Sequence, residues 1–159
     1  MSFDVGHLGR GDAVHMHRLQ TDAFETAWSV DSLQALLGQA AVFGIGLWPE
    51  KRGAGDALLA ALCAQIAGED AELLLLATAP LHQRRGYARR LLWEATQEAS
   101  ARGAARWILD VAADNEPAQA LYQSLGFTID GRRRAYYARR DSPRADALLM
   151  SCAMSGLQG

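Results

Sequence analysis

The chain has 159 residues, a formal net charge of −2, and a composition that is 50% hydrophobic and 21% charged. This length predicts one domain that spans residues 1–159, and the apolar content excludes disorder as the main state. The longest apolar runs, at 57–64 and 73–77, are far shorter than the roughly 20 residues that a membrane-spanning helix needs. The small net charge argues against nucleic-acid binding through a generally basic surface.

Three further features bear on the cellular compartment and on metal binding: the N-terminus, the cysteines and the histidines. Met1 to Asp4 contain no charged-then-apolar signal segment, which predicts a cytoplasmic protein. Cys63 and Cys152 are the only cysteines, and their apolar neighbours favour free buried thiols over a disulfide. His15 and His17 leave a helix in different directions, so we expect no metal site there.

The first part of the chain predicts two helices and two strands. The helices are expected over 11–24 and 32–37, and the strands over 41–47 and 56–66. Ser29 or Asp31 can cap the second helix, and Pro49 followed by a loop over 51–55 ends the first strand. The segment 56–66 has the Ala and Leu content of a helix, but its place between two strand candidates favours a strand.

Strands and helices alternate in the second part of the chain. Strands are expected over 72–78, 107–111, 127–130 and 147–154, and helices over 86–102 and from Pro117 to Gly126. The continuous apolar run at 72–78 is typical of a strand buried on both faces. Gly103 suits the end of the first of these helices. The alternation predicts an α/β fold with a mixed sheet.

The segment Gln83-Arg84-Arg85-Gly86-Tyr87-Ala88-Arg89 lies between a buried strand and a helix. The start of a helix leaves unpaired N–H groups and carries partial positive charge, and Gly86 lets the backbone approach a ligand closely. With three arginines nearby, this pattern indicates an anion site suited to a pyrophosphate. An Arg-rich solvated turn is the alternative. Neither the P-loop nor the Gly-x-Gly-x-x-Gly pattern is present.

The motif and its context resemble the GCN5-related N-acetyltransferase (GNAT) superfamily, whose phosphate loop reads Gln/Arg-x-x-Gly-x-Gly/Ala. A later run, from Asn115 through Ala120-Leu121-Tyr122 to Leu125-Gly126-Phe127, is also typical of it. The resemblance is closest to the RimI type, which acetylates the N-terminal alanine of a ribosomal protein. The resemblance to the superfamily is strong from Leu73 to Met154. Three short segments indicate the RimI subtype: Ala27-Trp28-Ser29, 132–137 and 146–150.

The resemblance implies a single-domain GNAT fold whose mixed, mostly antiparallel sheet is splayed in the middle and flanked by helices. It implies acetyl-CoA as cosubstrate and no metal. The backbone of Leu76, Ala77 and Thr78 would bind the pantetheine arm, and a free N–H there would stabilise the oxyanion. Asn115 would contact the cofactor from the end of the next strand. The pyrophosphate would be held by a contiguous set of residues: Arg84, Arg85, Gly86, Tyr87, Ala88 and Arg89.

The same resemblance makes Tyr122 the acid for the departing thiolate and places Asp110 where RimI-type enzymes often have a Glu base. Tyr, with a pKa of about 10, and a thiol, with about 8.5, are close enough for proton transfer. Asp is shorter than Glu by about 1.5 Å, which favours a bridging water. Ala112 replaces a common Arg, so one peptide contact is expected to be missing. Tyr136 and Tyr137 are expected to shape the acceptor groove.

Several of these residues also have ordinary structural interpretations. Tyr122 lies on the apolar face of its helix, Asp110 can be a partnered structural acid, and Asn115 can simply cap the helix at Pro117. Tyr136 and Tyr137 can equally stack in a surface hairpin. The arginines between 132 and 144 are by default a solvated loop, with an electrostatic contact to ribosome-associated material as the lesser alternative.

The chemistry of amines favours an α-amino acceptor. About a tenth of α-amino groups, with a pKa of about 7.8, are neutral at pH 7, against roughly one lysine side chain in 2500. A weak base relayed through water therefore suits an N-terminal amine. We expect an acetyltransferase that acts by direct attack on the N-terminal alanine of a ribosomal protein. It needs no nucleic acid or membrane and is a monomer or weak homodimer. The alternatives are acetylation of a small-molecule amine, such as a polyamine, and a non-catalytic acyl-CoA-binding module.

Overall fold

The computed structural model describes residues 3–24, 26–50 and 57–158, which form a sheet with helices on its faces. The strands are β1 (Phe3–Leu8), β2 (Val42–Pro49), β3 (Ala60–Ala67), β4 (Asp70–Thr78), β5 (Arg106–Ala112), β6 (Thr128–Tyr137) and β7 (Ala145–Ala153). The helices are α1 (Ala13–Ala23), α2 (Val30–Leu37), α3 (Tyr87–Ala101) and α4 (Glu116–Ser124). Short 3-10 turns occupy Arg10–Asp12, Pro80–His82 and Met154–Gly156.

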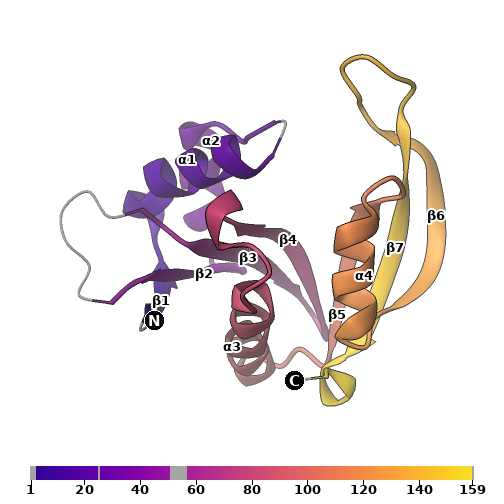
Figure 1. Cartoon of the computed structure of the whole chain (residues 1–159). Coiled ribbons are helices and arrows are strands. Elements are labelled where there is room, and N and C mark those ends of the chain that lie inside the picture. Colours follow the sequence, from indigo (N-terminus) through magenta and orange to yellow (C-terminus); the bar gives the residue numbers. More distant parts are fainter. Residues whose placement is uncertain (1–2, 25, 51–56, 159) are drawn as a thin grey trace.

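The strand order is β1-β2-β3-β4-β5-β7-β6, and every neighbouring pair is antiparallel except β4 and β5. Those two parallel strands pair only where 70–72 meet 106–108. Beyond this point they diverge, and Figure 1 shows the two parts of the sheet opening like a V. The predicted mixed, mostly antiparallel sheet splayed in its middle is confirmed.

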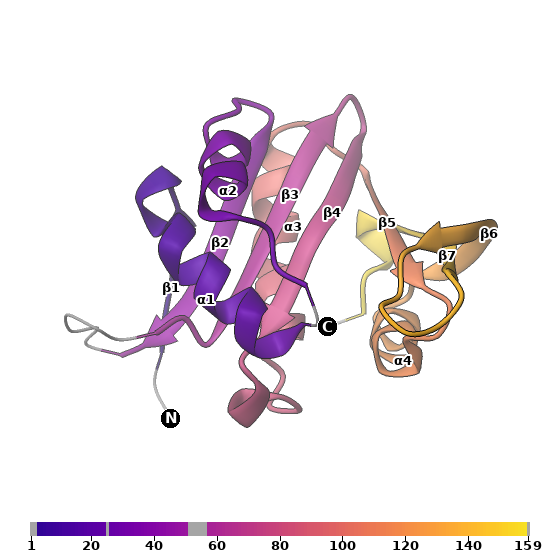
Figure 2. The same ribbon diagram turned by 90° about the horizontal axis from the view of Figure 1, so that it is seen from above.

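The helices cover both faces of the first part of the sheet. One core cluster joins α1 and α2 to one face of β2, β3 and β4, with Met16 and Leu33 fully buried. A second cluster joins α3 to the other face and continues into β5 and β7, around Leu91, Leu92 and Trp107. Figure 2 shows α1 and α2 on one side of this layer and α3 on the other, with α4 beside the separate β5, β6 and β7.

Most of the predicted elements are present. The segment assigned to a strand despite its helical composition is β3, which begins at Ala60. Ser29 caps α2, because its Oγ accepts a hydrogen bond from the Ser32 N–H at 3.1 Å. Gly103, with a φ of 95°, ends the turn after α3 as predicted. The predicted loop over 51–55 lies outside the described residues.

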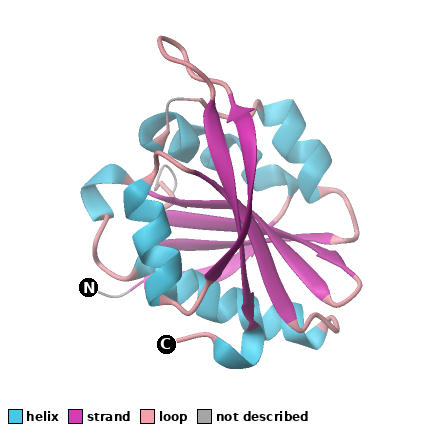
Figure 3. Cartoon of the chain, turned by 90° about the vertical axis from the view of Figure 1, so that its right-hand side faces the viewer, coloured by secondary structure: helices cyan, strands magenta, loops and turns pink. Residues whose placement is uncertain are grey.

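Two predictions about strands were wrong or incomplete. The strand β1 was not predicted, because 3–8 mix apolar residues with a Gly and polar side chains; its pairing with β2 makes it a strand. The strand expected at 127–130 is β6, which continues to Tyr137. Three of the six arginines expected in a loop, Arg132, Arg133 and Arg134, belong instead to this exposed strand, where hydrogen bonds to β7 replace apolar burial (Figure 3). The other three follow β6 in the connection to β7.

A bulge in β4 changes the direction of its side chains. Cys63 pairs with Leu75 and Ala64 pairs with Leu73, so Leu74 has no opposite residue on β3. Such an extra residue shifts the alternation of faces. Leu73 therefore packs in the α3 cluster and Leu75 in the α1 and α2 cluster, which confirms a strand with cores on both faces.

The two cysteines are free and buried, and burial raises the pKa of the Cys63 thiol to about 12. Among the described residues, none of the helices has both the length and the apolar character needed to span a membrane.

Candidate active site

The divergence of β4 and β5 opens a cavity of about 780 Å³. Its walls are the open edge of β4 at 73–78, the turn and first residues of α3, the end of β5 at 109–112 and the inner side of α4. Tyr137 and Arg139 close it from β6 and the segment that follows. Most of the residues expected to act together, although far apart in sequence, share this one space.

The open edge of β4 presents backbone groups of alternate residues. The Ala79 N–H donates to the Leu59 carbonyl at 2.8 Å, and hydrogen-bonded and non-bonded pairs alternate along antiparallel strands. By this alternation the polar groups of Ala77 are directed to β3, whereas those of Leu76 and Thr78 face the cavity side. Thr78 already receives a hydrogen bond there, from the Gln83 side chain at 3.4 Å. An extended, amide-bearing ligand can therefore pair with Leu76 and Thr78, but not with Ala77.

The turn before α3 has the conformation of an anion-binding loop. Arg84 and Gly86 have φ values of 65° and 82°, and Gly86 is the N-cap of a 15-residue helix. Residues in this left-handed region next to a helix start direct successive N–H groups toward one side, which favours an anion. This geometry fits the diphosphate of a coenzyme A group.

The arginines of this loop have different surroundings. Arg84 and Arg89 line the cavity, whereas Arg85 does not, and its guanidinium lies 3.2 Å from the His82 Nδ1. Arg89 also donates to the Ser124 Oγ at 3.2 Å and thereby ties α3 to α4. The prediction that Arg85 contacts the pyrophosphate therefore gains no support from its position, while Arg84 has the clearest access.

Three titratable side chains meet deeper in the cavity. Asp110 on β5, Tyr122 on α4 and Tyr137 at the end of β6 all line it. Burial raises the pKa of Tyr137, and the negative charge of Asp110 raises it further. Within the described part of the chain, the Asp110 carboxylate has no hydrogen bond or ion pair, so it can accept a proton or order a water. The alternative of a partnered structural acid is not supported by these contacts.

Burial raises the pKa of Tyr122 well above its ordinary value, with a smaller contribution from Tyr137. Tyr122 is therefore a neutral phenol at any working pH and can donate a hydrogen bond into the cavity. The higher pKa widens the gap to a thiol of about 8.5, so complete proton transfer is less favourable than the sequence suggested. Its ring also packs 5.5 Å from that of Phe127, so the structural and chemical interpretations are compatible.

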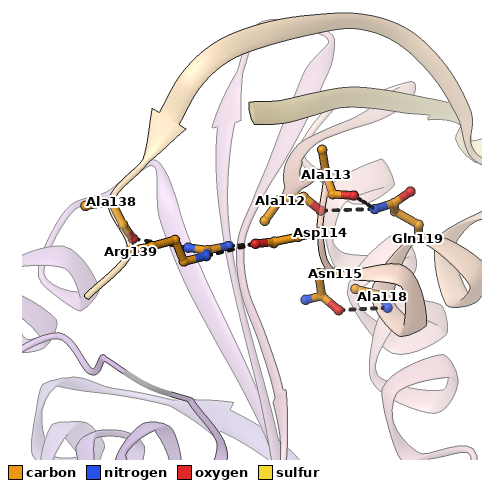
Figure 4. A network of polar contacts seen from close by, with 8 residues as sticks. All are labelled: Ala112, Ala113, Asp114, Asn115, Ala118, Gln119, Ala138 and Arg139. Atoms are coloured by element: carbon orange, nitrogen blue, oxygen red, sulfur yellow. Dashed lines mark hydrogen bonds and ion pairs between the residues drawn. The ribbon is translucent and has the colours of Figure 1, made fainter. Parts of the chain in front are cut away.

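Asn115 and Tyr136 have structural roles of the kind considered above. The Asn115 Oδ1 accepts the Ala118 N–H at 3.2 Å and caps α4 (Figure 4). Asn115 still borders the cavity, so a ligand contact stays a prediction. Tyr136 is 45% exposed, packs edge-on against Tyr137 at 5.1 Å, and lies outside the residues that line the cavity.

A second cavity of about 740 Å³ adjoins the first, and the two share Phe24, Asn115 and Arg139. Thr26, Asp114, Ala138 and Arg140 complete its lining. The sequence did not indicate Phe24, Asp114 or Arg139 as site residues. Arg139 stands in an Arg-rich stretch, and no local pattern distinguishes it from its solvated neighbours.

Comparisons with known proteins agree with this geometry. The model of the acetyltransferase (GNAT) family matches residues 13–127. The [ribosomal protein bS18]-alanine N-acetyltransferase of Escherichia coli is 41% identical over 91 residues, which are 57% of this chain and 61% of that protein. A Bacillus subtilis relative, provisionally given the same name, is 29% identical over 147 residues, 92% of each chain.

The crystal structure of the ribosomal-protein-S18-alanine N-acetyltransferase from Escherichia coli superposes with a TM-score of 0.84 and 29% identity, covering 96% of this chain and 94% of that one. The family match includes the residues that line the first cavity, except Tyr137 and Arg139. The chain belongs to the acetyltransferase (GNAT) family, whose members use acetyl-CoA.

Proposed function

We propose that the protein transfers an acetyl group from acetyl-CoA to the α-amino group of a protein N-terminus, and that its acceptor is the N-terminal alanine of ribosomal protein bS18. The observation that carries this proposal is one cavity lined both by an anion-binding helix start and by Asp110 and Tyr122. The named relatives supply the acceptor.

Residues in different parts of the cavity bind different parts of acetyl-CoA. The thioester supplies an activated acetyl group. The N–H groups at Leu76 and Thr78 hold the pantetheine arm in an extended shape, and an N–H on this edge faces the oxygen that becomes negative. The turn at Arg84 and Gly86 holds the diphosphate.

Proton movements then follow from the charges. The neutral amine attacks the carbonyl carbon, a C–N bond forms, and the C–S bond breaks. Asp110 takes the amine proton through a water, because its side chain is short. Tyr122 donates a hydrogen bond to the sulfur as negative charge develops on it, and coenzyme A leaves as the thiolate. The thiolate then takes a proton from water, and Asp110 releases the amine proton to solvent.

The acceptor side favours a peptide over a polycation. Among the described residues, the lining of the second cavity includes Arg139, Arg140 and the single carboxylate of Asp114. A polyamine site needs an excess of acidic groups, because its ligand carries several positive charges. Ala112 stands where RimI-type enzymes often have an Arg, so we expect the peptide contacts to come from other residues.

A competition between acceptors tests the proposal. The full chain is incubated with acetyl-CoA and a peptide that begins with the bS18 alanine, the same peptide with a blocked N-terminus, peptides with other first residues, and spermidine. We expect acetylation of the free alanine peptide alone at neutral pH, read by mass spectrometry. Acetylation of spermidine but of no peptide contradicts the proposal.

The matched variant Tyr122→Phe removes one hydroxyl. We expect turnover to fall by about 10²-fold or more, with the affinity for acetyl-CoA nearly unchanged by calorimetry. Binding of acetyl-CoA by the wild-type chain without acetylation of any amine identifies the non-catalytic module instead.

A further inference from the structure

The segment 138–144, which connects β6 to β7, is attached to the turn between β5 and α4 by one ion pair. The Arg139 Nε and Nη2 donate to the two carboxylate oxygens of Asp114, at 3.0 and 2.7 Å. Two guanidinium nitrogens thus engage the two carboxylate oxygens, which is the stronger, orienting geometry for this pair, and the third donates to the Ala138 carbonyl at 3.2 Å. Figure 4 shows the pair spanning the space between the two segments.

The turn that carries Asp114 is itself firmly held. The Gln119 side chain donates to the carbonyls of Ala112 and Ala113, each at 3.0 Å. The Ala113 N–H donates to the Asp146 carbonyl on β7 at 2.7 Å. Asp114 is consequently presented from a fixed backbone, and the ion pair restrains Arg139 rather than the reverse.

Arg139 lies where the two cavities meet, on the route that we expect an acceptor to take. It lines both cavities, and its guanidinium lies 5.8 Å from the ring centre of Tyr137, which reaches the Asp110 end of the first cavity. An acceptor that approaches from the second cavity toward Asp110 must pass these side chains. The position of the 138–144 segment therefore sets the width of the passage.

We propose that Asp114 and Arg139 form a clasp that positions the acceptor: the pair holds the 138–144 segment and Tyr137 against the β5–α4 turn and so shapes the passage to Asp110. The acceptor role rests on the proposed function. The clasp is a positioning pair, since it acts through the segment and through Tyr137 and takes no part in the bond changes.

A second ion pair in the same sheet provides a matched control. Arg106 binds Asp70 with the same two-pronged geometry, at 3.1 and 3.3 Å. This pair lies at the closed end of β4 and β5, roughly 20 Å along β5 from the β5–α4 turn at 3.3 Å per residue. Asp70→Asn thus removes the same kind of interaction without touching the acceptor passage.

The experiment compares Asp114→Asn, Asp114→Glu and Asp70→Asn with the wild-type chain. For Asp114→Asn we expect KM for the acceptor peptide to rise about fivefold, the upper end for exposed pairs because the geometry is bidentate. In Asp114→Asn, KM for acetyl-CoA is expected to change no more than it does in Asp70→Asn. Asp114→Glu keeps the charge and is expected to restore most of the acceptor KM.

Hydrogen–deuterium exchange supplies a readout that needs no substrate. Asp114→Asn is expected to speed exchange in 138–144, and Asp70→Asn to leave it unchanged. Unchanged exchange in Asp114→Asn, or an equal rise in both KM values, overturns the clasp.

Failure of the proposed function is recognised separately, by a wild-type chain that does not acetylate the alanine peptide. The KM comparison then uses whichever amine of the panel is acetylated. With no acetylated amine, faster exchange in 138–144 supports the clasp and unchanged exchange overturns it.

Discussion

The strands β2 and β6 belong to one sheet, but their residues differ strongly in solvent exposure. Every residue of β2 except Pro49 is buried, with helices on both faces. In β6, all of which the structure describes, no residue is buried. The first part of the sheet is therefore stabilised by apolar packing, and the β6 edge by hydrogen bonds to β7 and by ion pairs.

Those polar contacts are specific. Asp146 accepts the Arg132 Nε at 2.6 Å and the N–H of Ala135 at 2.8 Å, and Ala135 lies in the left-handed region with a φ of 51°. Asp146 thus holds an irregular stretch of β6 that leads directly to Tyr137. The comparison teaches that the cavity walls on β4 and α3 are built on the packed core. The wall at Tyr137 and Arg139, where we propose that the acceptor enters, depends instead on a few surface charges. Substitutions can alter acceptor choice there without disturbing the core.

The largest effect expected from this contrast is on stability. Leu62 on β3 is fully buried, and Leu62→Ala should lower the free energy of unfolding by about 3 kcal/mol, because a cavity remains. Ile129 on β6 is 49% exposed, and Ile129→Ala should change it by less than about 0.5 kcal/mol. Urea denaturation measures both, and similar losses would remove the distinction between the two parts.

An intermediate effect concerns catalysis. Asp110→Asn should lower kcat/KM by about 10²-fold at neutral pH if Asp110 is the base, and less at high pH where more of the amine is already neutral. Because Asp110 makes no ion pair within the described residues, the unfolding free energy should change by less than about 0.5 kcal/mol. Rates measured across the pH range decide this, and a profile identical to that of the wild type shows that Asp110 is structural.

The smallest effect is the response to acid. The hydrogen bond from Arg139 lowers the pKa of Asp114, and hydrogen bonds from Ala135 and Arg132 lower the pKa of Asp146. A carboxyl whose folded pKa is lowered contributes stability above its unfolded pKa of about 3.9, and loses it as the pH falls through the folded value. The melting temperature should therefore decline below about pH 4.

The double variant Asp114→Asn/Asp146→Asn is expected to flatten this decline, because both groups then stop titrating. Melting curves recorded between about pH 3 and 6 test it. An equally steep decline in the double variant means that acid acts elsewhere in the molecule.

Local patterns were sufficient for much of the fold and site. Apolar runs marked β4 and β5, a four-residue repeat marked α3, and Gly86 marked its start, since a left-handed φ before a helix favours glycine. These features depend on neighbours in sequence. The family resemblance, rather than local patterns, placed Asp110, Tyr122 and the turn at Arg84 in one functional group.

Local sequence patterns did not predict the pairing between segments that are distant in sequence. The pairing of β4 with β3 decides which amides of β4 face the cavity, and it directs the polar groups of Ala77 to β3. The clasp between Asp114 and Arg139 joins residues 25 positions apart, and neither has a local signature.

The amino-acid sequence by itself determined most of the elements after β1 and the glycine turn before α3, because periodicity and glycine positions act over a few residues. Its motifs identified the family. Only the tertiary structure decided strand register, which carboxylates are paired, and how wide the acceptor passage is. Those features depend on contacts between distant segments, whose free energies are set by geometry that no short stretch of sequence contains.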